Sequence, residues 1–497
     1  MATMVAVDLG AQSGRVVLGS YDGRRLDVRE VHRFSNVPVA ARGVLRWDVL
    51  RLFGDVLQGL RAATVEAGSI DAVGVDSWGI DFGLLDRKGR LLQNPVHYRD
   101  ARRAAAVEAA LSVVPARELY ERTGIQHLPI NTIFELAALA ADDDPVLEVA
   151  ETLLLIPDLM HYWLGGRPAV ERTNATTTQC WDAREGAWAV DILERLEIPA
   201  RLFPEIVRPG TELGALSDEV AVDTGVAGAK VIAPATHDTG SAVAAVPFRH
   251  PRSAYVSAGT WSCVGVELEH PVIDDRTFAA NVTNEGGVGE TFRLLRNVTG
   301  LWLLHECRRI WALEGHELGF DELISMTEDA PPLRSLIDPD DERFAPPGDM
   351  PRRIREFCLE TGQEEPTERA AVVRCILESL ALGHARVVRL LDQATGADPE
   401  EIHVVGGGAQ NELLCRWTAN AAGRPVLAGP VEAAAIGNLV VQAIALGELA
   451  SIAEARELIR GSFEPVVYEP EGAAEWDEAW ERFQELGDPR SRAGVSS

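Results

Sequence analysis

The chain has 497 residues, of which 46% are hydrophobic, so it can form two large domains or three smaller ones with sizeable cores. Its formal net charge of −29 argues against nucleic acid or an anionic membrane as a partner, because both bind basic surfaces. No stretch approaches the ~18–20 consecutive apolar residues that a membrane-spanning helix requires.

The first half of the chain alternates between strand and helix patterns. Apolar, β-branched runs predict three consecutive strands, and an amphipathic helix, a fourth strand and two further helices follow. The expected strands are 4–9, 15–21, 28–34 and 70–76, and the expected helices are 48–67, 101–113 and 131–141. This β-β-β-α-β-α order is typical of a ribonuclease-H-like α/β fold with a mixed sheet.

The second half repeats this order. The expected strands are 254–257, 262–268, 291–296 and 401–405, and the expected helices are 300–312, 367–391, 411–422 and 432–447. We therefore predict an α/β protein with two ribonuclease-H-like domains, 1–245 and 246–470, and a C-terminal tail, 471–497. The joint is expected near Ala244–Pro251, and a ligand cleft is expected between the two domains.

Two related strand–turn–strand segments carry small residues in their turns. They are VAVDLGAQSGRVVLGSYDG (5–23) and AYVSAGTWSCVGVEL (254–268). Small residues let backbone N–H groups face an anion, so the two turns predict a phosphorylated ligand held by both domains. Each turn alone is also compatible with an ordinary hairpin.

A third glycine-rich segment, HVVGGGAQN (403–411), follows a strand and precedes a helix. This position predicts a phosphate or ribose site at the helix N-terminus. The segment is neither a GxxxxGK[ST] loop nor a GxGxxG dinucleotide fingerprint, because its glycines are contiguous. A plain strand-to-helix turn is the alternative.

Two aspartates stand where such a site needs a carboxylate. Asp8 ends the first strand, next to the first small-residue turn, and a turn role is its alternative. Asp238 lies in APATHDTGSAVAAV between a strand and a helix, where an N-cap role is its alternative. No His, Cys and Glu cluster indicates a permanent metal site, and no serine lies in a GxSxG context.

At these residues the chain resembles a known family. DLGAQSGR, GTWS and GGGAQN are similar to the two phosphate loops and the adenosine loop of the FGGY carbohydrate kinases, in the actin/hexokinase/Hsp70-like superfamily. The resemblance extends from about residue 4 to about residue 465 and is strongest to the members that act on L-rhamnulose. The further segments that carry it are DSWGIDFGLLD (76–86), HYRDAR (97–102), TNATTTQ (173–179), ATHDTGSAV (235–243), NVTNEGG (281–287), NVTGLW (297–302) and GPVEAAAIGN (429–438).

The resemblance implies ATP-dependent transfer of a phosphoryl group to a ketose. By this resemblance Asp238 is the general base, and Asp8 orients Mg²⁺ directly or through water. The residues expected at ATP are Ala11, Gln12, Ser13, Gly14, Arg15, Thr260, His305 and Gly407. Those expected at the sugar are Gly79, His237, Asp238, Thr239 and Asn297, with Asp81, Tyr98, Arg99 and Asp100 as further candidates. Gln12 and His305 depart from the family pattern, which has a small residue and Gln at these places.

Other interpretations stay open beside this one. A sister FGGY kinase acting on xylulose or fuculose has the same fold, and a non-catalytic ATP-gated protein of the actin or Hsp70 type is a more remote alternative. The expected partners are the sugar and ATP, with either a monomer or a dimer as the assembled state.

The cysteines and the N-terminus predict a cytoplasmic location. MATMVAV lacks a basic region followed by a long apolar stretch, so we expect no targeting segment. Six cysteines without CxxC or zinc spacing predict reduced thiols. A disulfide between Cys358 and Cys375, which flank one loop and the start of one helix, is the open alternative.

Overall fold

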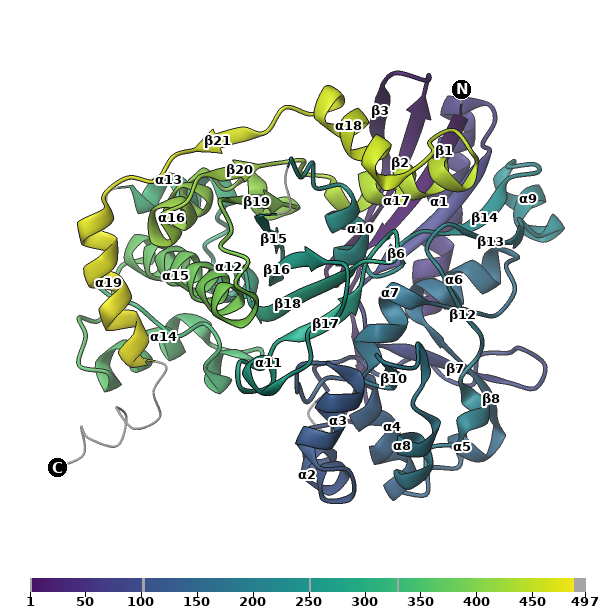
Figure 1. The fold of residues 1–497 in the computed structure, drawn as a ribbon, viewed down its shortest axis with the longest axis horizontal. Helices are drawn as coiled ribbons and strands as arrows, with labels where there is room; N and C mark the ends of the chain where they lie inside the picture. Colours follow the sequence, from purple (N-terminus) through teal and green to yellow (C-terminus); the bar gives the residue numbers. More distant parts are fainter. Residues whose placement is uncertain (1, 101–102, 250–251, 329, 487–497) are drawn as a thin grey trace. The chain divides into compact units, whose positions relative to one another are not determined.

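The computed structural model describes residues 2–100, 103–249, 252–328 and 330–486 (Figure 1). It divides into two compact units, each assembled from separate stretches of the chain. Unit 1 comprises Met1–Pro247, Glu267–Leu294 and Glu432–Phe463, and unit 2 comprises Phe248–Val266, Leu295–Val431 and Glu464–Ser497. These boundaries differ from the contiguous domains expected at 1–245 and 246–470. Residues 101–102 of one expected helix and 250–251 of the expected joint lie outside the described residues.

Unit 1 is built on a six-stranded mixed sheet in the order β13-β14-β6-β1-β2-β3. The strands β1 (Ala2–Leu9), β2 (Ser13–Tyr21) and β3 (Leu26–Ser35) form an antiparallel meander, as the sequence predicts. Strand β6 (Ala72–Ser77) lies parallel to β1, β14 (Lys230–Ala233) lies parallel to β6, and β13 (Thr211–Ala215) closes the edge. The C-terminal ends of β1, β6 and β14 therefore meet at one edge of the sheet.

Helices cover both faces of this sheet because successive side chains of a strand point to opposite sides. On β2, Val16 packs under Gly59 of α1 (Val49–Ala67), and Gly19 packs under Leu439 of α17 (Ala433–Ala445). Helices α6 (Ile156–Leu164), α9 (Asp218–Thr224), α10 (Asp238–Ala244) and α18 (Ile452–Ser462) complete the layers.

A further segment of unit 1 fills the chain between β6 and β13; the helices expected at 101–113 and 131–141 lie in it as α2 and α4, and its strands were not expected. Its strands are β7 (Phe82–Asp86), β8 (Ala150–Leu155), β9 (Val170–Glu171), β10 (Trp181–Asp182), β11 (Ala187–Trp188) and β12 (Ile206–Val207), and its helices are α2 (Arg103–Val113), α3 (Ala116–Thr123), α4 (Thr132–Ala141), α5 (Val146–Val149), α7 (Arg172–Ala175), η1 (Thr176–Thr178), α8 (Val190–Arg195) and η2 (Ala200–Leu202). The remaining elements of unit 1 are β4 (Val39–Ala41), β5 (Val44–Arg46), α11 (Asp275–Ala279) and β17 (Thr283–Gly286).

Unit 2 repeats the sheet pattern of unit 1. Strand β15 (Ser253–Ala258) pairs antiparallel with β16 (Trp261–Leu268) and parallel with β19 (Glu401–Val405), just as β1 pairs with β2 and β6. The strand neighbours run β18-β16-β15-β19-β20-β21, with β18 at Phe292–Thr299, β20 at Val426–Ala428 and β21 at Val466–Tyr468. The predicted duplication of a ribonuclease-H-like sheet is confirmed.

The helices of unit 2 surround a large apolar cluster that includes buried residues of the long helix α15. They are α12 (Trp302–Leu313), α13 (Phe320–Thr327), η3 (Glu342–Phe344), α14 (Met350–Glu360), α15 (Arg369–Thr395), η4 (Gly407–Gln410), α16 (Glu412–Ala422) and α19 (Ala473–Leu486). Cys358 and Cys375 are buried in this cluster as free thiols. None of the described helices is long and apolar enough to cross a membrane.

The C-terminal tail expected at 471–497 contains a packed helix. Helix α19 buries Trp476, Ala479, Phe483 and Leu486, which recur at helical spacing and join the apolar cluster of unit 2. This periodic pattern identifies the helix, and its burial makes it part of unit 2. The prediction of a tail is therefore corrected for residues 473–486.

Helices α10 and α17 lie side by side against β6 (Figure 1) and approach each other closely at a glycine. A Cβ added to Gly437 of α17 would lie 1.7 Å from the Ser241 carbonyl oxygen of α10. Only glycine permits this approach, which brings residues 432–463 into unit 1.

Gly437→Ala is expected to destabilise unit 1. The new Cβ forces α10 and α17 apart, and overpacking of this kind costs about 1–3 kcal/mol. Thermal unfolding should therefore show a lower Tm than that of the unmodified chain. Gly461→Ala in α18 is the matched control, because no atom lies within 4 Å of its added Cβ. It should leave Tm unchanged or raise it, since alanine favours a helix over glycine. An unchanged Tm in G437A would contradict the close helix contact.

Candidate active site

Asp8 lies at the C-terminal end of β1 and pairs with Arg15 across the hairpin. The two residues face each other in the β1–β2 register, and the Arg15 Nε and Nη2 atoms lie 2.8 and 2.7 Å from Asp8 Oδ2. Arg15 also forms an ion pair with Glu432, which precedes α17. The guanidinium expected at the phosphates thus bridges two carboxylates in this structure.

The turn between β1 and β2 holds the other residues expected at ATP. Gln12 and Ser13 are exposed, Ala11 is half-buried and Gly14 is buried, so the turn presents its middle to solvent. Asn36, which the sequence analysis did not single out, fixes this turn. Its Nδ2 donates to the Gly10 carbonyl and its backbone N–H donates to the Gln12 carbonyl, at 3.0 and 2.9 Å.

Asp76 brings a second carboxylate to the same edge of the sheet. It lies beside Asp8 in the parallel β1–β6 register and is fully buried. Its Oδ2 accepts a 2.6 Å hydrogen bond from Asn438 Nδ2, and its Oδ1 is buried without a hydrogen-bond partner among the described residues. Burial, followed by the charge of Asp8, raises the pKa of Asp76 well above its usual range. The only sequence signal for Asp76 is its position as a polar residue at the end of an apolar strand.

Asn438 itself is fixed by a short amide chain. Gln442 Nε2 donates to Asn438 Oδ1 at 2.6 Å and to the Val5 carbonyl of β1 at 3.0 Å. Asn438 Nδ2 lies 3.2 Å from the Gly74 carbonyl of β6 as well. Helix α17 therefore supports the ends of both carboxylate-bearing strands with buried amides.

Asp238 is the first residue of α10, directly after the turn that follows β14. His237 occupies the N-cap position without a side-chain capping bond, and the Asp238 carboxylate accepts the Thr239 N–H at 2.6 Å. The Asp238 side chain keeps 31% of its surface exposed. Burial raises its pKa above the ordinary value, the charge of Asp8 adds to the rise, and His237 and the Thr239 N–H oppose it. Such a carboxylate is a stronger base than a solvated one.

A buried glutamate holds the turn before Asp238. Glu171 Oε2 accepts from the Thr236 N–H and hydroxyl at 2.9 and 3.1 Å, and Oε1 accepts from the Thr173 N–H at 2.9 Å. The Thr173 hydroxyl donates to Glu171 and accepts the His237 N–H. Burial raises the pKa of Glu171. The TNATTTQ segment thus contributes to the position of Asp238.

Asp81, a candidate for sugar contact, is instead fully buried among aromatic rings. Its Oδ2 accepts from Trp47 Nε1 at 2.6 Å, Trp78 Nε1 at 3.0 Å and the Tyr98 N–H at 3.2 Å. The two indole rings lie 4.3 Å apart between centroids. The carboxylate orients the tryptophans, and the sugar contact expected of Asp81 stays a prediction. Tyr98 and Asp100 are also buried, and Asp100 accepts the Leu45 N–H.

Gly79 lies in a tightly held loop after β6. A Cβ on it would lie 2.8 Å from the Thr177 hydroxyl oxygen, so glycine is required. The next residue, Ile80, has φ +70°, which is costly for a β-branched side chain. Thr177 accepts the Ile80 N–H at 3.2 Å and Thr132 donates to its carbonyl at 2.6 Å. Backbone strain held by neighbours is typical of ligand-binding loops.

The remaining residues expected at ATP and the sugar belong to unit 2. Thr260 lies in the β15–β16 turn, and its carbonyl accepts the Gly300 N–H at 3.2 Å. Gly407 is exposed, with no atom within 4 Å of an added Cβ. Asn297 Oδ1 accepts from the Cys263 thiol at 3.0 Å. Burial lowers the pKa of His305 to about 4, so its imidazole is neutral and lies edge-on to Phe320.

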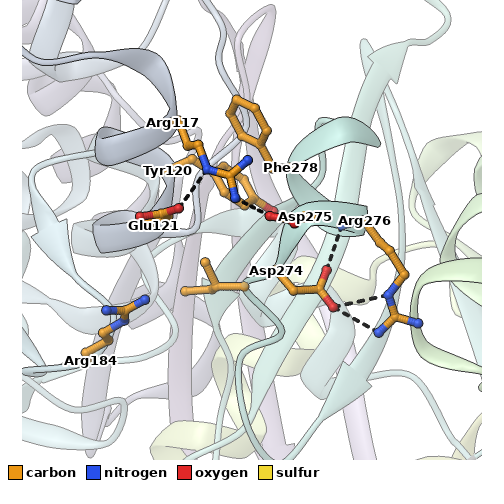
Figure 2. Close-up of a pocket in the computed structure, with 9 residues that line it drawn as sticks. Arg117, Tyr120, Glu121, Arg184, Asp274, Asp275, Arg276 and Phe278 are labelled. Atoms are coloured by element: carbon orange, nitrogen blue, oxygen red, sulfur yellow. Dashed lines mark hydrogen bonds and ion pairs between the residues drawn. The ribbon is translucent and has the colours of Figure 1, made fainter.

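A separate pocket of about 550 Å³ lies on unit 1 near α3 and α11 (Figure 2). Its charged lining is largely self-paired: Arg117 donates to Glu121 at 2.9 Å and contacts Asp275, and Arg276 pairs with Asp274. No residue expected at ATP or the sugar lines it. It is therefore distinct from the candidate active site.

The chain belongs to the FGGY family of carbohydrate kinases. The N-terminal domain of the family matches residues 3–245 and the C-terminal domain matches residues 254–446. The protein is accordingly an ATP-dependent sugar kinase, and the resemblance read from the sequence is confirmed.

Two rhamnulokinases are among the relatives that are at least 40% identical to this chain. The chain is 43% identical to the rhamnulokinase of Bacteroides thetaiotaomicron over 96% of this chain and 98% of that protein. It is 40% identical to the rhamnulokinase of Pectobacterium atrosepticum over 98% and 97%. In fold it is similar to a xylulose kinase from Lactobacillus acidophilus, with a TM-score of 0.81 at 17% identity over 100% and 99% of the chains. Plasmodium falciparum glycerol kinase gives a TM-score of 0.76 at 15% identity over 98% and 97%.

Asp76→Asn is expected to stabilise the protein at neutral pH. The native state keeps a proton on Asp76 that the unfolded chain releases above its ordinary pKa of 3.8. Native stability therefore falls as the pH rises from that value through the raised native pKa. Asn has no proton to lose and still accepts from Asn438. The Tm difference between D76N and the unmodified chain should grow with pH across this window in thermal scans.

Asp86→Asn is the matched control with the opposite sign. Hydrogen bonds from Arg90 lower the pKa of Asp86 to about 2, so its contribution is present above the ordinary value of 3.8 and is lost as the pH falls through about 2. D86N should therefore lower Tm at neutral pH. A D76N effect that does not vary with pH would contradict a protonated Asp76 in the native state.

Proposed function

We propose that this chain transfers the γ-phosphoryl group of Mg-ATP to L-rhamnulose and forms L-rhamnulose 1-phosphate, with Asp238 as the general base. The observation that carries the base assignment is the Asp238 carboxylate. It stands at the N-terminus of α10 beside two further carboxylates, is partly exposed, and has a raised pKa. The sugar identity is supported by the high identity to rhamnulokinases over nearly the whole chain.

The reaction needs positioning and a proton acceptor more than covalent chemistry. Asp238 takes the proton of the sugar hydroxyl while that oxygen attacks the γ-phosphorus atom. The bond from phosphorus to the β-phosphate bridging oxygen breaks, and ADP leaves with the electron pair. The Glu171 contacts to Thr173 and Thr236 hold the turn before Asp238, so the base keeps its aim during the transfer.

The residues at the strand ends fit a magnesium ion. Asp8 would hold it, and the ion would supply neutralisation of phosphate charge when bound. No group of three His, Cys, Asp or Glu side chains with metal-site geometry occurs among the described residues. A single carboxylate fits Mg²⁺, which keeps several waters and takes its other ligands from substrate phosphates. Release of Arg15 from Asp8 would free both groups for the nucleotide.

The proposed setting is the cytoplasm, where ATP is available. All six cysteines are free and buried, which fits a reducing compartment. The partners are the sugar and ATP. A sister kinase acting on another ketose is the competing assignment, since the solved structures that share the fold include xylulose kinases.

Asp238→Asn tests the base. Asn keeps the size and can accept the Thr239 N–H, but it cannot take the proton, so kcat should fall by ~10²–10⁴-fold. Steady-state kinetics at saturating substrates measure this, and nucleotide binding should survive. The matched control is Asp218→Asn, which alters the first residue of another helix, α9, and should keep kcat. A D238N variant with more than about a tenth of the unmodified kcat would contradict the assignment.

A substrate panel tests the sugar. L-rhamnulose should give a higher kcat/KM than D-xylulose, L-fuculose or glycerol in an ATP-consumption assay with Mg²⁺. Another ketose preferred by tenfold would assign the chain to a sister kinase and would leave the base assignment untouched.

A further inference from the structure

His237 lies between two carboxylates. Its Nε2 is 3.5 Å from Asp238 Oδ1, and its Nδ1 is 3.1 Å from Glu285 Oε2. Glu285 belongs to β17 and is nearly fully buried, at 3% exposure. A carboxylate behind an imidazole that faces a reactive group is a known means of fixing the ring and its protons.

Arg293 completes the arrangement. It is fully buried, its Nε donates to the Gly286 carbonyl at 2.8 Å, and its Nη2 lies 3.1 Å from Glu285 Oε2 and 3.2 Å from His237 Nδ1. The Gly286 N–H donates to the Thr176 hydroxyl at 2.9 Å, which anchors the strand that carries Glu285. The guanidinium is thus held through Nε and Nη2, and its charge offsets the buried charge of Glu285.

The Arg293 contact sets the role of one ring nitrogen. Nη2 of Arg293 can only donate, so at its 3.2 Å contact with His237 the Nδ1 atom is the acceptor. With Nδ1 occupied as an acceptor, the proton of the neutral ring is on Nε2, toward Asp238.

We propose that Glu285 and Arg293 are positioning residues that hold His237 with its Nε2–H toward Asp238, so that the catalytic base stays ionised and correctly aimed. The inference rests on the proposed role of Asp238 as the base. His237 then acts on the base in addition to its expected contact with the sugar.

The effect is needed because other groups act in the opposite direction. Asp238 is faced by Asp8 and Asp76, and His237 by Asp238, Glu285 and Arg293. Burial favours the protonated, inactive form of Asp238. A donor at Nε2 favours the ionised form. The 3.5 Å separation is long for a hydrogen bond and leaves room to shorten when the sugar is bound.

The test compares the pH dependence of kcat, which reports the enzyme–substrate complex, in three variants. His237→Leu removes the donor and should move the acid limb of the profile up by about one pH unit, because a hydrogen bond to a charged group is worth about that shift. His237→Gln can place an amide N–H near the Nε2 position and should return the limb toward its original place. Glu285→Gln combined with Arg293→Met removes both buried charges together and should shift the limb in the same direction as His237→Leu.

Imidazole ¹⁵N NMR of the unmodified enzyme supplies a readout that does not depend on a variant's folding. The His237 signals, assigned by their loss in His237→Gln, should show Nε2 protonated. A neutral ring with its proton on Nδ1 overturns the proposal. So does a KM for the sugar that rises at every pH in His237→Leu while the acid limb stays in place, because that result indicates a sugar contact alone.

The outcome is separable from the proposed function. If Asp238→Asn keeps its kcat, the base assignment itself fails. If Asp238→Asn is inactive and the acid limb stays fixed in both His237→Leu and the double variant, only the positioning role of Glu285 and Arg293 is overturned. The panel sugar with the highest kcat/KM serves as substrate, so the measurement does not require that sugar to be L-rhamnulose.

Discussion

Repulsion among three carboxylates at one edge of the unit 1 sheet is the constraint on which the rest of the site depends. Asp8 and Asp76 stand side by side at the ends of parallel strands, and Asp238 follows the third strand end. Burial, followed by the charge of Asp8, pushes both Asp76 and Asp238 toward the protonated form. In the proposed function, this edge would attract a divalent cation and would keep Asp238 a stronger base than a solvated carboxylate.

Each carboxylate is compensated by a different partner. Asp8 has the Arg15 guanidinium, Asp76 has the Asn438 amide, and Asp238 has His237 and the first amide of α10. The three partners differ in permanence. The Asn438 amide is buried, whereas the Arg15 guanidinium is partly exposed at the turn. In the proposed function, Arg15 would exchange Asp8 for a phosphate of ATP, while the Asp76–Asn438 pair would stay in place.

The scaffold behind these groups explains why unit 1 includes a segment from late in the chain. Helix α17 supplies Asn438 and Gln442, and it reaches β1 and β6 only because Gly437 lets it pack directly on α10. Asn438 can support the strand ends because the residue before it, Gly437, allows the helix contact. The hydrogen bond from Asn438 to Asp76 links residues about 360 positions apart in sequence.

The sequence by itself determined the element types, the duplicated sheet, the small-residue turns and the two key aspartates, because these depend on local periodicity and on motifs with fixed spacing. It also placed helices close to the observed α12, α15 and α16. The prediction missed the helix at residues 473–486 in unit 2. Trp476, Ala479 and Phe483 recur at helical spacing, but their burial depends on partners distant in sequence. Only the tertiary structure decided that Asp81 orients two tryptophans, that Asp76 joins Asp8, and that Glu285 and Arg293 stand behind His237. The physical reason is the same in each case: the charge and proton position of a side chain depend on residues brought near by strand pairing and helix packing, and those neighbours are remote in sequence.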